Sequence, residues 1–218
     1  MQQEPHRQPH VVITVEKVTK RFFPGTADEV EALRAVSLRI EAGEWVYVVG
    51  GNGSGKSTLL RTISGKHEPD AGYIERSVPR RAGVMFVGSD SSEELISSMT
   101  IYENLLLLNP SERRIPPFAR AYRSERRQRF SETLARFGLG LENRLEDQVV
   151  TLSGGQQQAV IVAKVLLSPA RVLLLDEFTS ALDRKTAPII LQILWEHCKK
   201  ADITVLAVTH DYHWIDQT

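Results

Sequence analysis

The sequence predicts an α/β fold that contains a parallel sheet and an inserted helical region. Four short apolar runs are typical of strands buried on both faces, and they cover residues 45–49, 83–87, 171–175 and 203–208. Segments with helical spacing of apolar residues separate these runs. Strands that alternate with helices form parallel sheets through right-handed crossovers, so this order predicts one such sheet.

The remaining elements follow from local patterns along the chain. Towards the N-terminus we expect a flexible tail at 1–10, a strand at 11–18, a loop at 22–31, a strand at 35–40, a turn at 41–44 and a helix at 57–63. Residues 11–218 are expected to form a single domain. In the C-terminal half, Ser153 is predicted to cap a helix that Pro169 ends, and a further helix is expected over 184–199.

Residues 100–144 change in character. They lack strand signals and are rich in arginine between Arg113 and Arg136, which predicts a helical insertion with a loop near Pro116 and Pro117. The insertion is expected to extend to about residue 150. Its arginines have two interpretations, either a site for phosphate or anionic lipid or simply a solvated helical face.

Composition excludes several classes of protein. The chain has 218 residues, enough for a sizeable core, and its 27 basic and 27 acidic residues balance. A nucleic-acid-binding protein would be more basic, so we expect no nucleic acid partner. A single cysteine, Cys198, rules out an internal disulfide and favours a reducing compartment. No apolar run is long enough to cross a bilayer, so membrane work would need another chain.

Three polar clusters follow three of the predicted buried strands. They are the segment 50–57, the pair Asp176 and Glu177, and His210. In open parallel sheets ligands gather beyond the carboxyl ends of the strands. The clusters therefore predict one common site.

The first cluster matches a phosphate-binding loop, G-x-x-x-x-G-K-[ST], in the strand–loop–helix context that this motif requires. It consists of Gly50, Gly51, Asn52, Gly53, Ser54, Gly55, Lys56 and Ser57. Glycines let backbone N–H groups converge on phosphate oxygens, and the helix N-terminus adds donors and a favourable dipole. Lys56 is predicted to lie between the β- and γ-phosphates, and the Ser57 hydroxyl to bind Mg²⁺. The alternative is an ordinary glycine-rich turn.

Asp176 and Glu177 are adjacent acids at the end of a predicted apolar strand. Neighbouring carboxylates repel each other, so such a pair is costly unless a cation offsets the charge or one of them acts as a base. We expect Asp176 to hold Mg²⁺ and Glu177 to polarise an attacking water as a general base. The alternative is that the pair has no function and only marks the point where a strand reaches solvent.

The sequence Leu152-Ser153-Gly154-Gly155-Gln156 resembles the signature motif of ATP-binding cassette (ABC) proteins. It lies about twenty residues before Asp176, and the resemblance runs from about Val11 to His210. It implies a P-loop NTPase core, an N-terminal antiparallel β-subdomain and an inserted α-helical subdomain. It also implies an ATPase that binds ATP and Mg²⁺ in a head-to-tail dimer.

The same resemblance assigns roles to single residues. Ser153, Gly154, Gly155 and Gln156 would bind the γ-phosphate of the partner's ATP, and Thr58 would extend the phosphate loop. Residues 180–183 look like the D-loop, with Asp183 at the nucleotide, and His210 looks like the switch histidine. Phe22 or Phe23 would stack on adenine; alternatively both pack against the β-subdomain.

The chain departs from the family pattern at three places. No glutamine occurs between Arg80 and Tyr102, where the family has one that contacts Mg²⁺ and senses the membrane partner; Ser89, followed by Asp90, takes that place. Ala159 replaces an arginine that many transporter ATPases carry. The chain also ends soon after His210, which looks short for a cassette.

Three functions remain open at this stage. The first is the energising subunit of a membrane transporter, with permease subunits, a second cassette and a substrate-binding protein as partners, at the cytoplasmic face of the membrane. Residues 139–145 and 156–159 are similar to a bacterial uptake branch associated with tryptophan or tyrosine. The second is a soluble cassette ATPase that acts on nucleic acid or ribosomes. The third is a module that dimerises on ATP without turnover.

Overall fold

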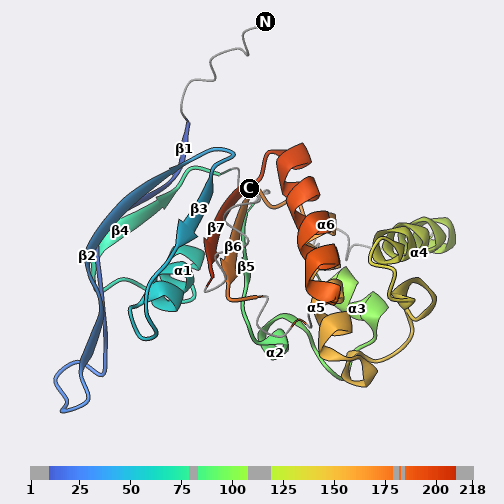
Figure 1. Ribbon diagram of the computed structural model, residues 1–218, viewed down its shortest axis with the longest axis horizontal. Helices are drawn as coiled ribbons and strands as arrows, with labels where there is room; N and C mark the ends of the chain where they lie inside the picture. The colour runs from blue at the N-terminus through green and yellow to red at the C-terminus, as the bar shows by residue number, and fades with distance from the viewer. Residues whose placement is uncertain (1–9, 79–82, 108–118, 179–181, 183–184, 210–218) are drawn as a thin grey trace, which may run out of the picture. The chain divides into compact units, whose positions relative to one another are not determined.

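The computed structural model describes residues 10–78, 83–107, 119–178, 182 and 185–209. It contains two compact units (Figure 1). The first unit comprises residues 1–86, 171–176 and 202–218, and the second comprises residues 87–170 and 177–201. The predicted tail lies outside the described residues except for His10, whose carbonyl accepts a hydrogen bond from the Ala42 N–H.

The first unit holds an antiparallel sheet in the order β2-β1-β4, which confirms the predicted β-subdomain (Figure 1). Its strands are β1 (Val11–Phe22), β2 (Val30–Glu41) and β4 (Ala71–Arg76). Both β1 and β2 are longer than predicted. Register shifts in the β1–β2 pairing, with positive φ at Lys17 and Ala35, interrupt the alternation that marks a strand in the sequence.

The prediction omitted β4. Five of its six residues are exposed and only Ile74 is half-buried, so the strand carries no apolar period. The pairing of β4 with β1 depends on Gly72, which has φ 79°. Its backbone lies so close to β1 that a Cβ there would be 2.3 Å from the Glu16 carbonyl oxygen. Only glycine fits this close approach between the strands.

A second sheet, in the order β3-β7-β6-β5, belongs to the first unit except for Val87, the last residue of β5. Its strands are β3 (Trp45–Val48), β5 (Val84–Val87), β6 (Val172–Asp176) and β7 (Thr204–Val208), and β7 pairs in parallel with both β3 and β6. All residues of β6 and β7 are buried, as predicted. The prediction that β3 is buried on both faces was wrong: its residues are half-buried because it is an edge strand of the described sheet.

Helix α1 (Lys56–Ser64) packs into the core of this unit. That core combines buried side chains of β1, β2 and α1 with alternate residues of β6 and β7, including Ile13, Leu60, Leu174 and Leu206. The loop that joins β3 to α1 is thereby fixed between a half-buried strand and a helix that contributes to the core.

The second unit is helical. It contains α2 (Ser91–Glu94), α3 (Ile101–Leu106), α4 (Ala119–Ala135), η2 (Leu141–Asn143), η3 (Val149–Thr151), α5 (Gly154–Leu167) and α6 (Thr186–Ala201). Helix α5 is central, since it contacts α2, α3, α4 and α6. The predicted helical insertion is confirmed by α3 and α4, whereas Pro116 and Pro117 lie outside the described residues. The single turn α2 was not predicted.

None of the helices in the described part of the chain combines the length and the apolar character needed to span a bilayer.

Candidate functional site

The phosphate loop is shaped by close packing against β2. Gly55 is the N-cap of α1 and adopts φ 91°, a left-handed conformation that favours glycine. A Cβ at this position would lie 2.3 Å from the Ala32 carbonyl oxygen. The backbone of β2 therefore presses on the last turn of the loop, and only glycine is compatible with that contact.

Lys56 lies inside the curl of the loop. The residue is 8% exposed, and its ammonium donates hydrogen bonds of 2.9 Å to the carbonyls of both Gly50 and Gly51. Because the N-cap is glycine, no side chain caps the first N–H groups of α1. The loop thus combines a buried cation with the N-terminus of a helix, and both favour an anionic ligand.

Ser57 and Asp176 converge beside this cation. The Ser57 hydroxyl donates a 2.8 Å hydrogen bond to Oδ1 of Asp176, a residue only 5% exposed at the end of β6. A hydroxyl and a carboxylate are hard oxygen donors that suit Mg²⁺, which commonly uses one or two protein ligands together with phosphate and water. No group of three or more His, Cys, Asp or Glu side chains is placed to hold a metal among the described residues, and such a magnesium site needs none.

Glu177 is half-buried and adopts φ 49°, which is unusual for a residue other than glycine. Such local strain often marks functional positions. Residue 177 belongs to the second unit. The predicted Asp183 and His210, and with them Ser180 and Ala181, lie outside the described residues.

The two candidates for adenine stacking differ in exposure and in their contacts. Phe22 is half-buried, and its ring makes an edge contact with His67 at a centroid distance of 5.5 Å. Phe23 is 66% exposed. Phe22 pairs with Val30 at the start of β2, the strand that touches Gly55 through Ala32. Both aromatic residues therefore lie near the end of the β1–β2 hairpin that approaches the phosphate loop.

The signature segment begins α5, and Ser153 is its N-cap as predicted. A capping box closes the turn: Gln156 N–H donates to the Ser153 hydroxyl at 3.4 Å, and Ser153 N–H donates to Gln156 Oε1 at 3.1 Å. Arg144 Nη1 donates to the same amide oxygen at 3.4 Å. Ser153 and Gly154 are exposed at this helix start.

Ser89 and Asp90, where the resemblance led us to expect a glutamine, lie next to α2. Ser89 and Asp90 are exposed, and the Asp90 carboxylate accepts a 2.8 Å hydrogen bond from Ser92 N–H at the start of α2. Hydrogen bonds from the Ser92 side chain and backbone lower the pKa of Asp90. The segment thus presents the Ser89 hydroxyl beside a carboxylate that caps a helical turn.

Sequence reasoning missed one residue next to the signature, Gln157. Its side chain accepts a 2.7 Å hydrogen bond from the Ser91 hydroxyl and donates towards the carbonyls of Val149 and Leu152 at 3.4 and 3.3 Å. The sequence shows only a run of three glutamines at 156–158. Because Ser91 lies 66 positions away, the run alone does not reveal which glutamine is bonded to it.

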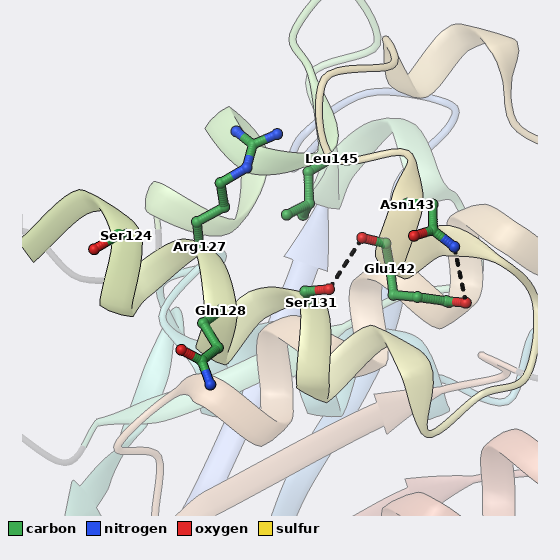
Figure 2. A pocket seen from close by; sticks show the side chains of 7 residues that line it. All are labelled: Ser124, Arg127, Gln128, Ser131, Glu142, Asn143 and Leu145. Carbon is green, nitrogen blue, oxygen red and sulfur yellow. Dashed lines mark hydrogen bonds between the residues drawn. The ribbon is translucent and has the colours of Figure 1, made fainter.

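A separate open pocket lies in the second unit, at α4 and the segment around η2 (Figure 2). It is lined by Ser124, Arg127, Gln128, Ser131, Glu142, Asn143 and Leu145. Arg127 belongs to the arginine-rich stretch, and Glu142, Asn143 and Leu145 belong to the segment 139–145, but the sequence did not predict a pocket there. The Ser131 hydroxyl donates to the Glu142 carbonyl, as Figure 2 shows, and Arg127 forms an ion pair with Glu146. Its lining is polar apart from Leu145, and the arginine in that lining, Arg127, is the one that pairs with Glu146.

The β3–loop–α1 arrangement defines a P-loop nucleotide-binding protein. A family model described as "ABC transporter" matches residues 33–180. The chain therefore belongs to the ABC transporter family.

Similar proteins include methionine import ATP-binding proteins. That of Enterococcus faecalis is 32% identical over 210 residues, and that of Escherichia coli K12 is 34% identical over 214 residues. These matches cover 90% and 92% of this chain but only 57% and 58% of the relatives. The chain thus spans somewhat more than half the length of the curated relatives it matches.

Solved structures support the fold. A dimeric post-hydrolysis state of the ATP-binding cassette MJ0796 bound to ADP and Pi superposes with a TM-score of 0.76 at 31% identity, and the match covers 93% of this chain and 89% of that one. The cassette cbiO1 from Clostridium perfringens, part of the transporter complex cbiONQ, gives 0.71 at 28% identity, with 95% and 82% covered. The mixed α/β cassette fold predicted from the sequence is confirmed.

Proposed function

We propose that this chain binds ATP with Mg²⁺ at its phosphate loop and hydrolyses it as the energising subunit of a bacterial importer. One observation carries the proposal: the buried Lys56 ammonium and the Ser57–Asp176 pair meet at the same glycine loop. An anion-binding helix start, a cation and a pair of hard oxygens form the set that a metal–nucleotide needs.

Lys56 is the principal phosphate ligand in this proposal. In the described state its ammonium is held by two neutral carbonyl oxygens. Charge-assisted hydrogen bonds to phosphate are stronger than those to a carbonyl, so the side chain gains by turning towards the β- and γ-phosphates. The loop shape that Gly55 and Ala32 fix remains the same during this exchange.

Ser57 and Asp176 would hold Mg²⁺. When bound, the ion neutralises charge on the phosphate oxygens. The 2.8 Å contact between the two side chains shows that their oxygens already share one small volume. Asp176 is buried, so its carboxylate is presented in a place where water screens it little.

Glu177 is proposed as the general base. It follows Asp176 directly, and its left-handed backbone conformation turns the chain sharply at the end of β6. Such a turn presents consecutive side chains in different directions, so one carboxylate can serve the metal while the next accepts a proton from water. We propose that His210 orients this water and that Asp183 contacts the nucleotide.

A second cassette would complete each site. Ser153, Gly154 and Gly155 begin a helix whose N-terminus suits a γ-phosphate, and the MJ0796 cassette is described as a dimer with ADP and Pi. We propose the same head-to-tail use of Gln156 and its neighbours here. Phe23, exposed beside the hairpin end, is the better candidate for adenine stacking, since Phe22 is engaged with His67.

The biological setting follows from the relatives. The proteins named above are methionine import subunits, which supports an importer with permease subunits and a substrate-binding protein at the cytoplasmic face of the membrane. The sequence prediction of tryptophan or tyrosine as cargo stays a prediction. Both assignments agree on uptake of an amino acid.

A second candidate function is a module that dimerises on ATP with little turnover. It is favoured by one observation, the Ser89–Asp90 segment in place of the family glutamine. Neither side chain is long enough to match the reach of a glutamine. Retention of Glu177 favours turnover instead.

ATP hydrolysis by the purified chain distinguishes these functions. We expect Mg²⁺-dependent turnover that disappears in Glu177→Gln, with an ATP-trapped dimer on size-exclusion chromatography. Glu196→Gln, an exposed acid on α6, is the matched control and should keep full turnover. Dimerisation without turnover in the wild type would favour the second candidate. Absence of both ATP binding and dimerisation would contradict the proposed function.

A further inference from the structure

We propose that Gln157 is a positioning residue that links α2 to the signature loop. The proposal rests on the proposed function, in which the signature binds ATP. The Gln157 side chain uses both ends of its amide: the oxygen accepts from the Ser91 hydroxyl at 2.7 Å, and the nitrogen donates to the Leu152 carbonyl at 3.3 Å. Leu152 directly precedes Ser153, the cap of α5. One side chain therefore joins α2 to the peptide that presents the signature.

Further hydrogen bonds hold Gln157 at the start of α5. Gln157 N–H also donates to the Ser153 carbonyl at 2.9 Å, and the side-chain nitrogen reaches the Val149 carbonyl at 3.4 Å. The loop from η3 into α5 is thus held to the first turn of the helix through its carbonyls. Rotation of the Gln157 amide would release Val149 and Leu152 together.

Helix α2 is attached to α5 at a second point. Lys164 donates to the Glu94 carbonyl, at the last residue of α2, and Lys164 as a residue is only 7% exposed. Gln157 and Lys164 are seven residues apart, which is two helical turns, so both lie on one face of α5. The two ends of α2 are therefore held along that face, and a displacement of α2 reaches Gln157 through Ser91.

Helix α2 is also where the chain departs from its family. It starts directly after Ser89 and Asp90, the place of the missing glutamine. The contacts of Ser91 and Gln157 give this segment a route to the nucleotide through the signature, which does not require a long side chain at residue 89. We infer that the position of α2 sets the geometry of Ser153 and thereby the ATP concentration needed for dimerisation.

Variants at both ends test the link in the Glu177→Gln background. Ser91→Ala and Gln157→Leu should each raise the ATP concentration for half-maximal dimerisation about threefold to tenfold, the effect of losing one or two hydrogen bonds. Because one link is broken in both cases, the double variant should be no worse than the stronger single variant. ATP affinity of the monomer at the phosphate loop should stay unchanged.

Conservative variants separate positioning from packing. Ser91→Thr keeps the hydroxyl and should restore dimerisation. Gln157→Glu keeps an acceptor for Ser91 but removes the donor to the Leu152 carbonyl, so it should be as defective as Gln157→Leu. Gln192→Leu is the control, because this exposed glutamine on α6 donates a 3.0 Å hydrogen bond within its own helix, to Glu196.

Hydrogen exchange of the protein without nucleotide is a test of the link that does not depend on ATP binding. Ser91→Ala should raise exchange at the amides of Leu152, Gln156 and Gln157 about threefold or more, while amides of α1 stay unchanged. If Ser91→Ala raises this exchange but the Glu177→Gln protein does not dimerise with ATP, the proposed function would be overturned and the link would still be supported. Unchanged exchange, or additive single variants, would overturn the link.

Discussion

In the proposed function two helix N-termini bind ATP, and they differ in whether a side chain caps their backbone N–H groups. Helix α1 begins at Gly55 without a side-chain cap, and the nearby cation rests on loop carbonyls. Helix α5 begins at Ser153 with a capping box, supported further by Arg144. The first N–H groups of α1 therefore have no side-chain cap, whereas in the signature the N–H groups of Ser153 and Gln156 already have acceptors within the segment.

This difference suggests that the two helix N-termini contribute differently to ATP binding. An uncapped helix start gains hydrogen bonds when phosphate arrives, which favours strong binding by one chain alone. A capped start gains less, because the Ser153 hydroxyl must be shared between Gln156 N–H and a phosphate oxygen. We therefore expect the phosphate loop to determine affinity and the signature to determine dimerisation.

The largest expected effect comes from Lys56→Ala. Removing the buried ammonium deletes charge-assisted hydrogen bonds to phosphate, so ATP affinity should fall by about two orders of magnitude or more. Binding of a fluorescent ATP analogue measures this directly. Lys66→Ala is the control: that exposed lysine lies over the Phe86 ring at 4.2 Å, in the same unit, and its loss should leave affinity intact. Unchanged affinity in Lys56→Ala would contradict the site assignment.

The next effect tests the shape of the uncapped start. Gly55→Ala forces a Cβ to within 2.3 Å of the Ala32 carbonyl at φ 91°. Strain and clash together should lower the free energy of unfolding by about 3 kcal/mol and impair ATP binding. Gly25→Ala isolates the strain, because Gly25 has φ 77° but nothing lies within 4 Å of its Cβ position. It should cost about 1 kcal/mol in urea unfolding. Equal costs for the two variants would show that the packing on β2 is unimportant.

The comparison also shows what the sequence could predict. Both helix starts were found because their residue types have one local explanation each, glycines and lysine for phosphate and serine for a cap. The buried strands β6 and β7 were found because continuous apolar runs mark strands buried on both faces. These signals need no knowledge of distant residues.

The remainder depends on contacts between distant segments. Strand β4 carries an exposed pattern, and the turn α2 is too short to show a period. The tie between Ser91 and Gln157 joins residues 66 positions apart. The half-burial of β3 follows from its edge position, which an apolar run does not reveal. Patterns within a segment cannot report which other segment covers it.

A smaller effect tests the capped start. Ser153→Ala and Thr100→Ala each remove the N-cap of a capping box in the second unit, at α5 and α3. Each should lower the free energy of unfolding by about 1 kcal/mol. Only Ser153→Ala should also weaken ATP-dependent dimerisation of the Glu177→Gln protein, measured by sizing against ATP concentration. A matching dimerisation defect in Thr100→Ala would mean that stability, rather than phosphate binding, explains both.

The smallest effect concerns the sheet beside the phosphate loop and its dependence on pH. Asp70 Oδ2 accepts a 2.5 Å hydrogen bond from Arg21 N–H, and Oδ1 lies 3.1 Å from Lys20 Nζ. These contacts, the backbone bond first, lower the pKa of Asp70 below its ordinary value of 3.8. The folded state thus favours the ionised form. Its contribution to stability is present above the unfolded pKa and is lost as pH falls through the folded pKa.

Asp70→Asn should therefore lower the melting temperature slightly near neutral pH, and the difference from wild type should close as pH drops below about 4. Added salt should shrink the difference at neutral pH, since the Asp70 side chain is 44% exposed and its ion pair with Lys20 is screened. ATP affinity should not change, because neither contact involves the loop from Gly50 to Gly55. A difference that stays constant into strong acid would show that the Asp70 carboxylate acts there through packing alone and not through its charge.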